Sequence, residues 1–147
     1  MTGPGGTLDF AAIDVGDQLT PMVIDVTATR IVAGAIASRD FMPAHHDQGF
    51  ANAQGAPDIF MNILSDTAFC SRFLTDWAGP EVTVTRLAIQ LGVPVFPGHT
   101  LTYTGEVTAV GQSEGVGLIE ISLRASSDLG DHVTGTAEVR LPVGIPD

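Results

Sequence analysis

Asp40 and His45 stand five residues apart in the stretch SRDFMPAHHD, residues 38–47, and Pro43 lies between them. In a loop that a proline bends and stiffens, this spacing lets a carboxylate and an imidazole face one small volume. A neutral imidazole can accept a proton while the carboxylate orients a water molecule or relays the other proton. Such a pair could hold and activate one water molecule.

Plainer interpretations of these side chains stay open. Asp40 could be a simple helix-end or turn residue, and His45 and His46 could be solvated loop side chains. A metal site built from His45, His46 and Asp47 is less favoured. Adjacent histidines in a strand or loop tend to point apart, and no clear third ligand follows. We therefore expect no metal.

The residues before this stretch predict a strand and a helix that lead into it. Residues 21–26, PMVIDV, have the β-branched content of a short strand. Residues 28–38 carry apolar side chains at helical spacing, with Thr27 or Thr29 as the cap. Residues 40–57 are rich in proline and glycine, so an irregular connection is expected there, with room for one helical turn.

A long buried helix is predicted for residues 58–79. Apolar residues occupy most of its sides and leave a thin polar stripe, which is typical of a helix enclosed by its surroundings. Asp58 is expected as its N-cap, and Gly79-Pro80 ends it. Asp66, on the stripe, could line a cleft, or it could equally well face solvent or an interface. Unpaired N–H groups at the start of this helix would stabilise a carbonyl oxygen that gathers negative charge.

The hydrophobic period changes to two in the second half of the chain. Four runs, 82–96, 100–110, 116–126 and 132–143, alternate or are rich in β-branched residues, and turn sequences separate them. They predict an antiparallel meander. The fold class is therefore α+β, with one sheet wrapped around one long apolar helix. Such a sheet leaves an exposed edge or face, which favours dimerisation.

The composition is that of one compact domain. The 147 residues suit a single core, with 1–7 as a flexible tail and 8–147 as the domain. A net charge of −11 argues against nucleic acid and anionic membranes as partners. No apolar run is long enough to span a membrane, so a cytoplasmic protein is expected. Cys70 is expected to be a buried, inert thiol, and His132 a surface residue at the start of a strand.

The stretch SRDFMPAHHD resembles the signature of the MaoC-like (R-specific, type 2) enoyl-CoA hydratases, commonly S-G-D-x-N-P-x-H-x-D. Five residues match it in register: Ser38, Asp40, Pro43, His45 and Asp47. The segments DVGDQLTP and LGVPVFPGHTLTYTGEVTAV are also similar to the family. The resemblance covers roughly residues 14–142 and implies the hot-dog fold.

A closer resemblance is to the small subunit of the two-subunit MaoC-like hydratase of bacterial steroid (cholesterol) side-chain degradation, carried by DIFMNIL-x-DT and TDWAGP. It implies hydration of an α,β-unsaturated steroid acyl-CoA. Asp40 and His45 would bind the catalytic water and deliver hydroxide to Cβ and a proton to Cα. The thioester oxygen would rest on backbone N–H groups near Gly55, Asp58 and Ile59. No cofactor is implied, because CoA is part of the substrate.

The sequence departs from the family pattern at several positions. Arg39 replaces the usual glycine and Met42 the usual asparagine, which removes a polar neighbour of the pair. Ile59 stands where many relatives have glycine, so a thioester would approach the helix start less closely.

The resemblance also implies a partner. It would be a second, larger MaoC-like subunit that lacks the acid–base pair, in an α2β2 heterotetramer. The charge of the chain agrees with this, because CoA is an anion and would be repelled unless positive groups come from elsewhere. Arg86 or Arg124 could touch the CoA phosphates, although a solvated strand position is favoured for both.

Two other classes of function compete with the hydratase. The chain could be a catalytically silent hot-dog subunit that binds acyl-CoA or stabilises a partner enzyme. A thioesterase or an acyl-carrier dehydratase is the third class. Retention of both Asp40 and His45 favours the hydratase, because a silent subunit has no need of them.

Overall fold

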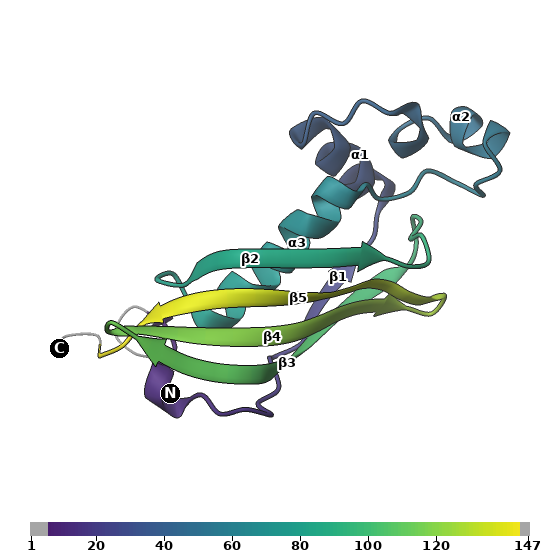
Figure 1. The fold of residues 1–147 in the computed structure, drawn as a ribbon. Helices are drawn as coiled ribbons and strands as arrows, with labels where there is room; N and C mark the ends of the chain where they lie inside the picture. The colour runs from purple at the N-terminus through teal and green to yellow at the C-terminus, as the bar shows by residue number, and fades with distance from the viewer. Residues whose placement is uncertain (1–5, 145–147) are drawn as a thin grey trace.

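A curved antiparallel sheet and one long helix make up most of the computed structural model, which describes residues 6–144. The elements in chain order are η2 (Phe10–Ala12), β1 (Met22–Asp25), α1 (Ala28–Ala37), η3 (Pro43–His45), α2 (Gln48–Ala53), α3 (Ile63–Ala78), β2 (Thr83–Leu91), β3 (Thr100–Ser113), β4 (Val116–Ser127) and β5 (Gly130–Pro142). Figure 1 shows α3 running behind the sheet, with α1 and α2 gathered at one end of the molecule.

The sheet has the strand order β1-β3-β4-β5-β2, and every neighbouring pair is antiparallel. The predicted meander is therefore right for β3, β4 and β5 but wrong for β2, which pairs with β5 at the far edge. After β2, the N–H groups of Gly92 and Val93 still bond to carbonyls at the start of β5. Pro94 and Pro97 then break the ladder, because proline has no N–H to donate. The chain crosses to β3 instead of forming a hairpin.

Helix α3 packs its apolar side chains against the sheet. Cys70, Phe73 and Leu74 are fully buried, and the strands bury alternate residues, as the period of two predicts. This arrangement confirms the α+β class and the hot-dog fold. Burial raises the pKa of the Cys70 thiol to about 12, and the nearby Asp66 carboxylate adds to this shift. The thiol is therefore buried and protonated, as expected.

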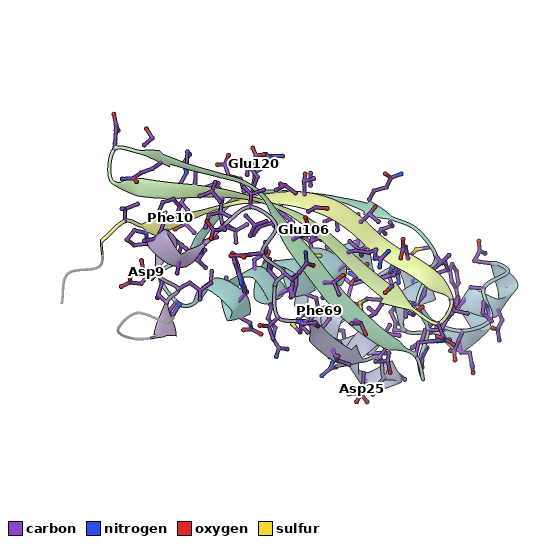
Figure 2. The ribbon with its side chains drawn as sticks, turned by 90° about the horizontal axis from the view of Figure 1, so that it is seen from below. Asp9, Phe10, Asp25, Phe69, Glu106 and Glu120 are labelled. Atoms are coloured by element: carbon purple, nitrogen blue, oxygen red, sulfur yellow. The ribbon has the colours of Figure 1, made fainter. Side chains whose placement is uncertain are left out.

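Aromatic contacts tie α1 to α3 and the sheet. Phe69 of α3, labelled in Figure 2, packs against Tyr103 of β3 with ring centroids 6.4 Å apart. The guanidinium of Arg30, on α1, lies 5.9 Å from the centroid of the Phe69 ring. Thr27 caps α1 by accepting a hydrogen bond from the Arg30 N–H. Strand β1 and helix α1 are thus where the sequence predicted them.

The start of the long helix differs from the prediction. Helix α3 begins at Ile63, and Asn62 is its N-cap, whereas Asp58 was expected in that role. The Asp58 carboxylate accepts a hydrogen bond from the N–H of Ile59 instead. Ile59 is buried, and the N–H of Met61 bonds to the carbonyl of Val95. These long-range contacts hold the segment 58–62 outside the helix, although Pro57-Asp58 is a favourable start.

The ends of the chain also bear on the predictions. Of the expected tail 1–7, residues 1–5 lie outside the described residues. Thr7 is buried and the Leu8 N–H donates to the carbonyl of Ala78, so the packed part of the chain begins before residue 8. Between residues 6 and 144, no helix is both long and apolar enough to cross a membrane.

Candidate active site

Asp40 is held in place by the turn that ends α1. The N–H of Arg39 bonds to the carbonyl of Ile36 and the N–H of Asp40 bonds to the carbonyl of Ala35. Arg39 has φ 57°, in the left-handed region. This pair of bonds around a left-handed residue is the Schellman motif, in which glycine is the usual residue. The carboxylate of Asp40 therefore projects from a defined turn and not from a loose loop.

His45 ends the short turn η3 and is buried. Its Nδ1 lies 2.7 Å from the carbonyl oxygen of Phe60, and the Phe60 ring meets the imidazole edge to face at 4.9 Å. A carbonyl oxygen can only accept, so Nδ1 carries the proton and Nε2 keeps its lone pair in the neutral ring. Nε2 faces Asp40 Oδ2 at 3.5 Å. The structure thus brings the two predicted residues together with their proton-accepting atoms toward each other.

Asn62 is a third member of the site that sequence reasoning missed. Its amide Nδ2 donates to Asp40 Oδ2 and to Ser38 Oγ, both at 2.9 Å, and its Oδ1 accepts from the N–H of Ser65. One side chain therefore caps α3 and orients the carboxylate. The available signal was weak: Asn62 is a good capping residue placed next to a helical pattern. The contact to Asp40 spans 22 residues and has no sequence signature.

The hydrogen bonds around Asp40 favour its charged form. The hydrogen bond from Asn62 is the largest cause, and the bond from the Met42 N–H is the second. Both lower the pKa of Asp40 below its usual value of 3.8. Partial burial opposes this shift, and a positive charge on His45 would add to it. Asp40 is therefore a carboxylate, with one oxygen bonded to Asn62 and directed toward the imidazole.

The pair opens onto a cavity of about 280 Å³. Asp40, His45 and Asn62 line it together with mainly apolar residues: Phe60, Met61, Ile63, Leu91, Gly92, Pro94 and His132. Ile63 is the first residue of α3. The first N–H groups of a helix have no acceptor inside it, so this end of the cavity offers hydrogen-bond donors and the positive end of the helix dipole.

The three residues expected at an oxyanion site lie elsewhere. Gly55 is an exposed residue with φ 92°, just after α2. Asp58 and Ile59 precede the helix, and the Ile59 N–H is already bonded to the Asp58 carboxylate. None of the three is among the residues that line the cavity. The expectation was tied to a helix start at Asp58, and the structure moves that start to Ile63.

The neighbouring polar residues do not converge on a shared point. His46 is exposed and its Nε2 lies 3.3 Å from the carbonyl of Phe41. Asp47 caps α2 through the N–H of Phe50. Within the described part of the chain, no group of three or more histidine, cysteine or acidic side chains is arranged to hold a metal ion.

Two further expectations are corrected. His132 was expected at the surface, and Asp66 at a cleft, in solvent or at an interface. Both are buried, and His132 Nε2 lies 2.8 Å from Asp66 Oδ1. Arg86 and Arg124 are half exposed, next to Glu120 and Asp131 respectively, which agrees with solvated strand positions.

Comparisons with known proteins extend over most of the chain. No family model matches it. It is 44% identical over 127 residues to a Mycobacterium tuberculosis protein named 3-oxo-4,17-pregnadiene-20-carboxyl-CoA hydratase beta subunit, covering 86% of this chain and 95% of that protein. The crystal structure of the ChsH1-ChsH2 complex from Mycobacterium tuberculosis matches with a TM-score of 0.83 and 44% identity, over 87% of this chain and 98% of that chain.

A second solved structure shares the fold at lower identity. It is an (R)-hydratase from A. caviae involved in PHA biosynthesis, with a TM-score of 0.80 and 26% identity. The match covers 89% of this chain and 98% of that chain. The similarity therefore rests on the whole fold as well as on one motif.

Proposed function

Because the chain belongs to the MaoC-like hydratase family, we propose that it is an enoyl-CoA hydratase subunit acting on a steroid side-chain acyl-CoA. The 44% identical relative is named for 3-oxo-4,17-pregnadiene-20-carboxyl-CoA, and a thioester of that kind is the proposed substrate. The observation that carries the proposal is the Asp40–His45 pair, 3.5 Å apart beside a cavity at the amino end of α3.

Water addition needs one group to take a proton and a path that returns one. Nε2 of His45 and Oδ2 of Asp40 can both accept from a single water molecule that lies between them and the substrate. One O–H bond of that water and the Cα=Cβ π bond break, the water oxygen bonds to Cβ, and the pair delivers the released proton to Cα. Atoms and charge balance without an oxidant or a metal. We therefore propose a reaction without a resident cofactor, since CoA is part of the substrate.

Negative charge develops on the thioester oxygen while the bond to Cβ forms, and a site that stabilises this charge lowers the barrier. In the proposed complex the oxygen lies at the first turn of α3, near the N–H groups of Ile63 and Leu64. These residues take the place that was first expected for Gly55, Asp58 and Ile59. Ile63 supports this assignment because it lines the same cavity as Asp40 and His45.

A second subunit belongs to the proposal. The cavity of about 280 Å³ is smaller than most sites for drug-sized ligands, roughly 300–1,000 Å³, and a steroid thioester is larger still. Two large apolar residues that line it are exposed, Ile63 by 47% and Leu91 by 40%. The charge of −11 repels the CoA phosphates. We propose an α2β2 complex in which a larger MaoC-like subunit covers these residues and supplies positive charge.

The direct test is to co-purify the chain with its larger subunit and to incubate the complex with the steroid enoyl-CoA. Mass spectrometry should detect a product heavier by one water molecule, with the thioester intact. The chain alone should show little turnover. Release of free CoA thiol would indicate a thioesterase, and binding without turnover would indicate a silent subunit; either result would contradict the proposal.

A further inference from the structure

Asp66 and His132 form a buried pair that the proposed mechanism does not use. Their exposed fractions are 0% and 2%. His132 Nε2 lies 2.8 Å from Asp66 Oδ1, and His132 Nδ1 lies 2.6 Å from the carbonyl oxygen of Val93. The pair joins the first turn of α3 to the start of β5 and to the segment that follows β2.

Both partners of the imidazole are acceptors. A carbonyl oxygen cannot donate, so Nδ1 carries a proton; with Asp66 as a carboxylate, Nε2 carries one as well and the ring is positively charged. Burial disfavours that charge, but the hydrogen bond and the charge of Asp66, with the Val93 carbonyl, raise the pKa of His132. Among the described residues, Oδ2 of Asp66 has no hydrogen-bond partner. Each charge therefore depends on the other, and removal of one leaves a buried charge uncompensated.

Three successive contacts connect this pair to the catalytic imidazole. His132 holds the carbonyl of Val93, and two residues later the carbonyl of Val95 accepts the N–H of Met61 at 3.3 Å. The residue before Met61 is Phe60, whose carbonyl fixes His45 Nδ1 at 2.7 Å. His132 itself lines the same cavity as Asp40 and His45.

We propose that Asp66 and His132 are positioning residues for the hydratase site: as an ion pair they fix the segments 60–62 and 92–95, and so the orientation of the His45 ring. The inference rests on the proposed function. The pair makes no contact with the reacting atoms, since both ring nitrogens are already bonded. Its loss should therefore lower kcat more than it raises KM, because misplacement of a catalytic group by about 1 Å can cost on the order of a hundredfold.

The test uses Asp66→Asn and His132→Gln, singly and together, in the two-subunit complex. Each single variant should lose at least about tenfold in kcat. The double variant should regain part of it, because two neutral amides can bond to each other and to the Val93 carbonyl. His99→Gln is the matched control: His99 also lies 2.7 Å from an aspartate, Asp128, but His99 is only half-buried, Asp128 is exposed, and neither residue lines the cavity. Its kcat should stay at the wild-type value.

A readout independent of turnover separates positioning from folding. The chain has four histidines, so imidazole ¹⁵N spectra of the wild type and of each variant can be assigned. The wild-type ring of His132 should be doubly protonated at neutral pH, and the His45 signals should shift in both single variants but not in His99→Gln. A neutral His132 in the wild type, or unchanged His45 signals with unchanged kcat in folded single variants, would overturn the inference. An inactive wild-type complex would refute the proposed function instead, and the spectra alone would then decide the positioning role.

Discussion

The amide nitrogen of Asn62 lies 2.9 Å from the Asp40 carboxylate, and the two residues come from opposite sides of the irregular segment between α1 and α3. Asn62 also caps α3. The position of the carboxylate is thereby coupled to the start of the helix whose first residue, Ile63, lines the cavity. In the family signature a polar residue commonly stands at position 42, where this chain has methionine. Here an amide from another part of the chain contacts the carboxylate.

Substitution of Asn62 separates these two tasks. Asn62→Ser keeps a capping oxygen but removes the amide donor, so the pKa of Asp40 should rise toward 3.8 and kcat should fall by roughly ten- to a hundredfold. Asn62→Ala removes the cap as well and should cost about 0.5–2 kcal/mol of stability beyond the serine variant. Carboxyl ¹³C titration, turnover and denaturant unfolding measure the three effects. An unshifted Asp40 titration in the serine variant would contradict the coupling.

Substitution of Arg39 tests the left-handed turn from which Asp40 projects. Arg39→Gly should stabilise the protein by up to about 1 kcal/mol, because a left-handed backbone costs an L-residue roughly 1–2 kcal/mol and glycine little. Arg72→Gly is the matched control, since Arg72 lies inside α3 and the same change should cost about 1 kcal/mol there. Denaturant unfolding of the two variants should give opposite signs. Equal destabilisation would argue against the left-handed turn.

Close packing of α1 on α3 can be tested at Gly34. A Cβ at this position would collide with the side chain of Ser65 on α3. The collision costs about 1–3 kcal/mol and alanine inside α1 regains about 1 kcal/mol of helix propensity; Gly34→Ala should therefore cost up to about 2 kcal/mol net and lower kcat, because Ser38 and Asp40 follow α1 directly. Gly111→Ala, where nothing lies within 4 Å of the added carbon, should leave both quantities near the wild-type values. A Gly34→Ala protein as stable and active as Gly111→Ala would show that the contact does not constrain the site.

The buried ion pair predicts a pH dependence of stability. The pKa of His132 is raised in the folded state from an ordinary value of 6.5. The stability that protonated His132 contributes to the folded protein is thus complete below about pH 6.5 and is lost as the pH rises through the folded pKa. The other titratable groups near Asp66, Cys70 and Tyr103, have pKa values raised by burial and by Asp66, so they stay neutral across this range.

The stability difference between wild type and His132→Gln should consequently be greatest in mildly acidic solution and shrink at alkaline pH. Unfolding free energies at a series of pH values measure it. A difference that grows with pH would mean that His132 is neutral in the folded protein.

Local patterns predicted the parts of the structure that local forces determine. The cap and length of α1 and the strands follow from spacing and β-branched content, whereas the spacing of Asp40 and His45 allowed their closeness but left plainer interpretations open. The resemblance pointed to the same pair and to the fold. The catalytic role of the pair stays a prediction that the geometry supports.

The remaining features depend on contacts between distant residues. Asp58 has the sequence context of an N-cap, but the buried Ile59 and the Met61–Val95 hydrogen bond keep its segment extended, and Asn62 caps the helix. His132 looks like a polar residue after a turn, and only the fold places Asp66 against it. Neither the Met61–Val95 hydrogen bond nor the Asp66–His132 pair leaves a periodic signal in the sequence, so sequence spacing could not reveal them.

The central claim is that Asp40 and His45 together activate the water that adds to the enoyl-CoA. The most direct measurement is the hydration rate of the two-subunit complex with Asp40→Asn, His45→Ala or His46→Ala, after assembly has been verified for each. His46 adjoins His45 but is exposed and turned toward Phe41, so its variant should be fully active. The Asp40 and His45 variants should each lose at least about a hundredfold. Wild-type activity in either of these two assembled variants would contradict the account.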